Sequence, residues 1–180
     1  MEEKIISAGF GGQGVLLIGK ILALAGMLEG RKVSWVPSYG PEMRGGTANC
    51  TVIISSTEIS SPLAPEPDSI IVMNKPSLEA FEPILKKNGL LVMNSSLIDI
   101  KPKRSDIRVF FVPANEIAEK EIGNVKTANM VMLGAYTVLS GSVKMDSVKK
   151  ALEKEMKGEK QKFLPANLKA LELGAKTVKK

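Results

Sequence analysis

Short apolar runs alternate along this chain with longer segments whose apolar residues recur at helical spacing. The short runs are rich in Ile, Val, Leu or Thr and predict β-strands. They cover residues 4–8, 33–39, 47–54, 69–73, 90–93 and 107–112. The second of these strands is expected to end near Pro37.

The segments between the runs predict helices. Residues 15–29 place their apolar side chains on one face, and Gly30 follows as a C-cap. Residues 77–87 predict a short helix that Pro83 kinks or breaks, and another helix is expected over residues 116–121. Residues 126–139 are apolar on nearly every face, which predicts a buried helix. Residues 147–156 and 166–178 are amphipathic.

This alternation predicts an α/β fold. Short apolar strands that alternate with helices form a mostly parallel sheet flanked by helices on both faces. We therefore expect a Rossmann-like three-layer sandwich, in a single domain over residues 1–180, with lysine-rich helices from about residue 145. A chain of 180 residues fits one domain of ordinary size.

The residue inventory excludes several kinds of site. The chain has one cysteine, Cys50, and no histidine. It can form no internal disulfide, no Cys-x-x-Cys site for zinc or iron–sulfur, no Ser-His-Asp triad and no His-ligated metal site. Cys50 lies within a predicted strand without a histidine to activate it, and we expect a packed thiol rather than a nucleophile.

The charge of the chain does not indicate a nucleic-acid-binding protein. The net charge is +6, and the basic excess is mostly C-terminal lysine interspersed with glutamate, as on solvated helix faces. Aromatic residues make up 4%, too few for a base-stacking platform. Apolar stretches fall short of the roughly 18 residues of a membrane helix, and the acidic N-terminus does not resemble a signal peptide. We therefore expect a cytoplasmic protein that binds neither nucleic acid nor membrane.

A glycine-rich turn follows the first predicted strand. Gly9, Gly11 and Gly14 fit G-x-G-x-x-G, in which glycines let the backbone approach a phosphate at a helix N-terminus. The dinucleotide-binding form of this motif needs an acidic residue at the end of the second strand, where this chain has Val-Pro-Ser-Tyr39. NAD and FAD are therefore disfavoured. A tightly packed turn and another anion or nucleotide contact both stay open.

Two further polar segments carry candidate binding residues. Tyr39-Gly-Pro-Glu-Met-Arg-Gly-Gly46 contains Arg44, a natural bidentate partner for phosphate or carboxylate, although Glu42 can pair with it instead. Asn124-Val-Lys-Thr-Ala-Asn-Met-Val131 opens the buried helix with Lys126 and Asn129. Asn124 fits an N-cap, whereas a buried amide at Asn129 needs hydrogen-bond partners.

These three segments, in this order, resemble the γ subunit of 2-oxoacid:ferredoxin oxidoreductases. The resemblance covers about residues 4–141. The second segment is most similar to the 2-oxoglutarate branch, and the pyruvate and ketoisovalerate branches are close.

The resemblance implies one subunit of an enzyme that oxidatively decarboxylates a 2-oxoacid to an acyl-CoA and passes the electrons to ferredoxin. Thiamine diphosphate, magnesium and iron–sulfur clusters belong to the partner chains, which agrees with the absence here of a Gly-Asp-Gly thiamine motif. The chain alone is expected to bind none of these cofactors and to be inactive. Its expected partners are the α and β subunits and a ferredoxin-like δ subunit.

The resemblance also implies that this domain helps to assemble the complex and to hold coenzyme A. No catalytic residue and no metal ligand is expected. The residues expected to contact coenzyme A or a partner chain are Gly11, Gly12, Gln13, Gly14, Arg44, Gly45, Lys126 and Asn129.

Two other classes stay open. A stand-alone nucleotide-binding oxidoreductase is disfavoured by the missing acidic residue, and a basic regulatory or interaction domain by the low aromatic content.

Overall fold

The fold is built on one mixed β-sheet. The computed structural model describes residues 2–40 and 46–178. Its six strands have the order β2-β3-β1-β4-β5-β6, and every strand except β3 runs in the same direction. The mostly parallel sheet is thus confirmed, and the ends of each predicted strand lie within two residues of the ends of an observed strand. The strands are β1 (Glu2–Phe10), β2 (Lys32–Tyr39), β3 (Thr47–Ser55), β4 (Ser69–Val72), β5 (Leu90–Asn94) and β6 (Arg108–Val112).

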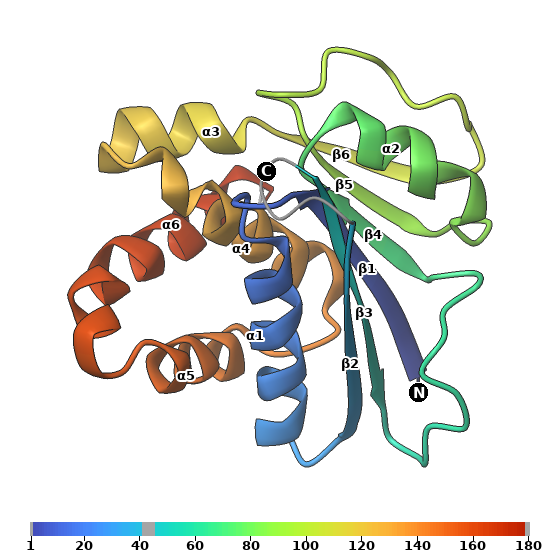
Figure 1. Ribbon diagram of the computed structural model, residues 1–180, viewed down its shortest axis with the longest axis horizontal. Helices are drawn as coiled ribbons and strands as arrows, with labels where there is room; N and C mark the ends of the chain where they lie inside the picture. The colour runs from blue at the N-terminus through green and yellow to red at the C-terminus, as the bar shows by residue number, and fades with distance from the viewer. Residues whose placement is uncertain (1, 41–45, 179–180) are drawn as a thin grey trace.

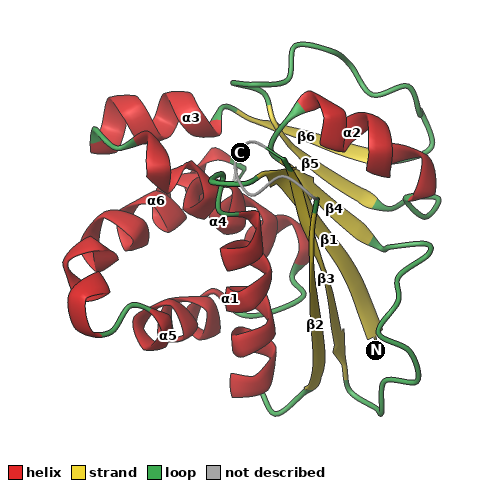
Figure 2. Cartoon of the chain, in the orientation of Figure 1, coloured by secondary structure: helices red, strands yellow, loops and turns green. Residues whose placement is uncertain are grey.

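Helices cover both faces of the sheet unequally. Figures 1 and 2 show α1, α4, α5 and α6 on one side of the sheet and α2 on the other. The predicted three-layer arrangement is confirmed, although the layer that contains α2 is thin. In the part of the chain that the structure describes, no helix is both long and apolar enough to cross a membrane. The helices are α1 (Val15–Leu28), α2 (Lys75–Phe81), α3 (Ala114–Ile117), α4 (Ala128–Ser140), α5 (Met145–Glu155) and α6 (Leu164–Thr177).

Proline acts differently at its two informative positions. Pro83 ends α2 and begins a short 3₁₀ turn, Glu82–Ile84, as predicted. Strand β2, by contrast, continues past Pro37 to Tyr39, so the predicted end near Pro37 is wrong. The Gly40 N–H donates to the Thr47 carbonyl at 2.7 Å, so even-numbered residues here turn their N–H groups toward β3. The missing N–H of Pro37 therefore faces the open edge of the sheet, where no hydrogen bond is lost.

The apolar core lies on both sides of the sheet. Ile5 of β1 faces the layer that contains α1 and α4, whereas its neighbour Ile6 faces α2. Burial on both faces explains why the parallel strands read as continuous apolar runs. Helix α1 contacts both strands of the β2–β3 hairpin and covers one of its faces. Val36 and Thr51 on its other face remain partly or largely exposed.

Helix α4 is anchored at the amino ends of the strands by a buried hydroxyl network. The Tyr136 hydroxyl lies 2.8 Å from Ser69 Oγ, and Ser69 Oγ donates to Glu3 Oε1 at 3.0 Å. Because Ser69 donates its hydroxyl proton to Glu3, the Tyr136 hydroxyl must be the donor in its bond to Ser69. Burial raises the pKa of the Glu3 carboxyl, and it raises that of the Tyr136 hydroxyl further.

Two glycines bring α4 and α6 into backbone contact. A Cβ on Gly134 would lie 2.0 Å from the Leu171 carbonyl oxygen, and one on Gly174 would lie 1.9 Å from the Val131 carbonyl oxygen. These atoms belong to helix backbones and cannot move aside as a side-chain tip can. The antiparallel pair α4 and α6 therefore exists at its observed spacing only because neither position carries a side chain.

We predict that Gly134→Ala and Gly174→Ala each lower the free energy of unfolding by about 1–3 kcal/mol, because an added methyl in a tight contact forces the helices apart. Alanine favours helix over glycine by roughly 1 kcal/mol, so helix propensity alone would predict a gain in stability rather than this loss. Urea unfolding followed by circular dichroism measures it. Glu153→Ala on the exposed side of α5 is the control, and stability equal to the control would contradict the close packing.

Cys50 is a packed thiol, as expected. Its side chain is fully buried, and Sγ donates to the Val15 carbonyl at 3.5 Å. Gly19 of α1 lies directly over it, since a Cβ there would be 2.3 Å from Sγ. Burial raises the pKa of the Cys50 thiol to about 11.

We predict that Cys50 makes the protein less stable as pH rises from about 9 to about 11. Over that range the unfolded thiol loses its proton while the folded one keeps it, so unfolding releases a proton and becomes more favourable. Cys50→Ala would remove this contribution and flatten the stability profile between about pH 9 and 11. An unchanged slope, or rapid alkylation of the native thiol by iodoacetamide at about pH 8, would contradict the assignment.

Candidate functional site

Amide side chains gather at the carboxyl ends of the parallel strands. Gln13 follows β1, Asn74 follows β4, Asn94 ends β5, Asn115 follows β6 and Asn129 lies in the first turn of α4. This edge is where open α/β sheets bind ligands. The side chains gathered there are neutral and can either donate or accept hydrogen bonds, so the direction of each amide decides what the edge can hold.

The glycine-rich turn after β1 is closed by its own glutamine. The Gln13 N–H donates to the Phe10 carbonyl at 3.1 Å, and Gln13 Oε1 accepts from the Phe10 N–H at 2.7 Å. Gly12 and Gly14 have φ values of +93° and +73°, in the left-handed region that glycine adopts without strain. The Gly11 N–H donates to the Gly46 carbonyl at 2.9 Å, which joins the turn to the start of β3.

Asn129 holds the turn against α4. Its side chain is 4% exposed, and its Nδ2 donates to the Gly14 carbonyl at 3.3 Å. Its Oδ1 accepts from the Met130 N–H at 3.0 Å, so both ends of the amide have partners. A Cβ on Gly14 would lie 2.3 Å from Asn129 Nδ2, so this contact also needs glycine. The partners that a buried amide at this position requires are thus found, one in the turn and one in α4 itself.

A hollow of about 140 Å³ opens between the turn and the start of α4. We call it the amide pocket. Lys126 is its one charged lining residue among those that the structure describes, and no carboxylate lines it. Asn124 positions this lysine by capping the short 3₁₀ turn before α4, since its Oδ1 accepts from the Lys126 N–H at 3.1 Å. The lining residues are Gly12, Gln13, Met73, Asn115, Val125, Lys126, Ala128 and Asn129.

A second hollow lies on the other side of the glycine-rich turn. It is more apolar and has a volume of about 210 Å³. Tyr39 lies at its rim with 71% of its surface exposed. The two hollows share Gly12, so the glycine-rich turn forms a wall between a polar and an apolar recess.

Most of the candidate residues come together at this edge of the sheet. Gln13, Lys126 and Asn129 line the amide pocket, Gly11 and Gly14 line the second hollow, and Gly12 lines both. Arg44 and Gly45 lie outside the described residues.

Sequence reasoning missed Asn74, Asn94 and Asn115. Each stands next to a strand or short helix as an ordinary cap or turn residue would: Asn74 caps α2, and the Asn94 oxygen accepts from the Ser96 N–H in the turn after β5. The one available signal was that each follows a predicted strand at its carboxyl end.

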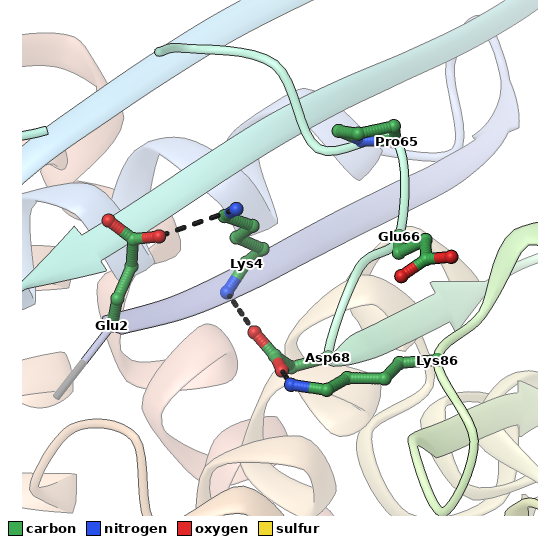
Figure 3. Close-up of a pocket in the computed structure, with 6 residues that line it drawn as sticks. All are labelled: Glu2, Lys4, Pro65, Glu66, Asp68 and Lys86. Atoms are coloured by element: carbon green, nitrogen blue, oxygen red, sulfur yellow. Dashed lines mark hydrogen bonds and ion pairs between the residues drawn. The ribbon is translucent and has the colours of Figure 1, made fainter. Parts of the chain in front are cut away.

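The largest hollow lies at the opposite end of the sheet and is a poor candidate. It has a volume of about 540 Å³, and Figure 3 shows Glu2 paired with Lys4 and Asp68 paired with Lys86. Lys4 Nζ lies 3.4 Å from a Glu2 carboxylate oxygen, and Lys86 Nζ lies 2.8 Å from one of Asp68. These opposite charges neutralise each other in an open, solvated recess. Within residues 2–40 and 46–178, no cluster of acidic residues and cysteine suits a metal ion.

Comparisons with known proteins identify the family. The family model of pyruvate ferredoxin/flavodoxin oxidoreductase matches residues 4–177. The chain is 41% identical to the ketoisovalerate oxidoreductase subunit VorA of Methanothermobacter marburgensis, over 99% of this chain but 37% of that protein. It therefore spans little more than a third of the length of VorA. It is 34% identical to the 2-oxoglutarate synthase subunit KorC of Methanocaldococcus jannaschii, over 96% of this chain and 94% of KorC.

Solved structures share the fold. The γ subunit of a keto/oxoacid ferredoxin oxidoreductase from Geobacter sulfurreducens matches with a TM-score of 0.85 and 28% identity, over 98% of both chains. The 2-oxoglutarate:ferredoxin oxidoreductase of Magnetococcus marinus, solved with 2-oxoglutarate, coenzyme A and succinyl-CoA bound, matches with a TM-score of 0.87 and 25% identity. That match covers 99% of this chain and 31% of the other. The chain therefore belongs to the pyruvate ferredoxin/flavodoxin oxidoreductase family and is a domain of the γ-subunit type.

Proposed function

We propose that this chain is the γ subunit of a 2-oxoacid:ferredoxin oxidoreductase and that its amide pocket contacts coenzyme A. The observation that carries the proposal is the pocket itself. It lies at the ligand-binding edge of the sheet, with Lys126 as its one charged lining residue among those described and with no lining carboxylate. Such a lining suits the phosphates of coenzyme A, which need donors and positive charge.

The chain would bind and orient rather than catalyse. Among the described residues that line the amide pocket there is no histidine, carboxylate, cysteine or hydroxyl group, and the amides do not titrate. Decarboxylation and electron transfer would therefore belong to the α, β and δ subunits with thiamine diphosphate, magnesium and iron–sulfur clusters. Arg44 and Gly45, in the segment after β2, remain candidates for a further coenzyme A contact. We place the complex in the cytoplasm.

The 2-oxoacid substrate is open between two branches. VorA and KorC, the relatives described above, are named for ketoisovalerate and 2-oxoglutarate. We retain 2-oxoglutarate as the first substrate to test, on the wording of the Tyr39–Gly46 segment, and ketoisovalerate as the alternative.

We expect the native chain to co-purify with thiamine- and iron–sulfur-containing subunits. The purified complex should reduce a low-potential dye when given a 2-oxoacid and coenzyme A. The ratio of kcat/KM for 2-oxoglutarate to that for ketoisovalerate assigns the branch. A chain recovered alone from gently lysed cells, with no such activity in any fraction, would contradict the subunit role.

We predict that Lys126→Met raises the KM for coenzyme A of the assembled enzyme about 5- to 30-fold and leaves kcat within about twofold. A hydrogen bond to a charged group is worth roughly 1–3 kcal/mol, and the exposure of Lys126 places the effect in the lower half of that range. Lys120→Met is the matched control, since Lys120 pairs with Glu116 at 2.7 Å and lies outside the pocket. Equal KM values for the two variants would remove Lys126 from the site.

A further inference from the structure

We propose that two buried asparagines, Asn74 and Asn94, fix the direction of the amides that line the amide pocket, so that Gln13 and Asn115 present only N–H donors and the pocket accepts a phosphate group. This inference deepens the proposed function of the same pocket and rests on it for the biological ligand. Asn74 is 4% exposed and Asn94 is fully buried, and neither lines the pocket. They would act as positioning residues.

The first relay runs from α2 to the glycine-rich turn. The Ser77 N–H donates to Asn74 Oδ1 at 2.9 Å, so this oxygen must be the acceptor end of the Asn74 amide. Asn74 Nδ2 then donates to Gln13 Oε1 at 3.0 Å. The Phe10 N–H donates to the same Gln13 oxygen at 2.7 Å. With two donors on Oε1, the NH₂ end of Gln13 is turned away from them, and Gln13 is one of the residues that line the pocket.

The second relay runs from β5 to α3. The Ala114 N–H and the Ser96 N–H donate to Asn94 Oδ1 at 3.2 and 3.3 Å, which fixes the orientation of Asn94. Asn94 Nδ2 then donates to Asn115 Oδ1 at 2.8 Å. The oxygen of Asn115 is thereby directed at Asn94, so its NH₂ group is the end turned away from this bond.

The two relays give the pocket a single polarity. An unconstrained amide can offer a ligand either its oxygen or its nitrogen. Here backbone N–H groups, which can only donate, set both relays, so reversing either pocket amide would bring two donors together in a part-buried place. Asn129 turns its oxygen to the Met130 N–H of its own helix. Gln13, Asn115 and Lys126 thus bring side-chain donors to the lining of one pocket, and a phosphate offers acceptor oxygens to match them.

Isosteric Asn→Asp changes test this inference without creating a cavity. In Asn94→Asp, one carboxylate oxygen keeps the Ala114 and Ser96 N–H bonds, while the other replaces the donor that faces Asn115. Asn115 would rotate to give its NH₂ to this new carboxylate oxygen and would turn its own oxygen into the pocket. Asn124→Asp is the matched control, because it adds the same charge beside Lys126, keeps the cap and leaves both relays intact.

The experiment titrates the full-length chain with pyrophosphate and follows the side-chain NH₂ signals of Gln13 and Asn115 by ¹H–¹⁵N NMR. We expect both signals to shift in the wild type, and we expect Asn94→Asp to weaken binding by about tenfold or more and to abolish the Asn115 response. Asn124→Asp should weaken binding no more than about threefold. Asn74→Asp should likewise abolish the Gln13 response, which provides a second test if Asn94→Asp fails to fold.

Two results would overturn the inference: equal affinities for the Asn94→Asp and Asn124→Asp chains, or wild-type NH₂ signals that do not respond to pyrophosphate. Glutarate, a dicarboxylate, is the comparison ligand, and tighter binding of glutarate than of pyrophosphate would also overturn the phosphate assignment. The KM for coenzyme A of the assembled enzyme tests the proposed function separately. Relay-dependent pyrophosphate binding with an unchanged KM would leave this inference standing and remove coenzyme A from the pocket.

Discussion

The structure depends on the burial of α4, a helix that is apolar on nearly every face. Helix α4 packs on the sheet with one face and on α6 with another, and the second contact is close enough to require Gly134 and Gly174. Tyr136 ties the same helix to Ser69 at the amino ends of the strands. With its position fixed in this way, the first turn of α4 meets the glycine-rich turn, and Asn129 reaches the Gly14 carbonyl. The candidate site is therefore set by core packing as much as by its own polar residues.

The chemistry of the site follows from the residues that the chain lacks. Without histidine, and with its single cysteine buried under α1, the protein has few groups that could exchange protons near neutral pH. What gathers at the ligand-binding edge is instead a set of amides, whose hydrogen bonds do not depend on pH. An edge of this kind can recognise and orient an anionic ligand over a wide pH range. That is the role proposed for this chain, whose partners would carry the redox cofactors.

The sequence predicts the fold well because its local signals agree. Apolar runs marked the strands, and the apolar segment before Gly141 marked α4 as buried. The predictions failed where the answer depends on pairing between distant segments. Pro37 is compatible with a strand only because β2 lies at an edge, which requires the strand order. Gly134 and Gly174 looked like ordinary helical glycines until α6 was placed on α4. Asn74, Asn94 and Asn115 carry no spacing motif, because their hydrogen bonds form two separate relays between segments that are distant in the sequence. Arg44 and Gly45, which the motif did mark, lie outside the described residues.

The hydrogen bonds that orient the amide pocket are all internal to this domain. Each donor and acceptor in the two relays lies between Phe10 and Asn115. The hydrogen bond from Asn129 to the Gly14 carbonyl joins the glycine-rich turn to α4. A site built in this way needs no neighbouring chain to fix its polarity. The same kind of domain makes up nearly the whole of KorC and about a third of VorA. In a chain of either length, the domain itself would determine which end of each amide a ligand meets.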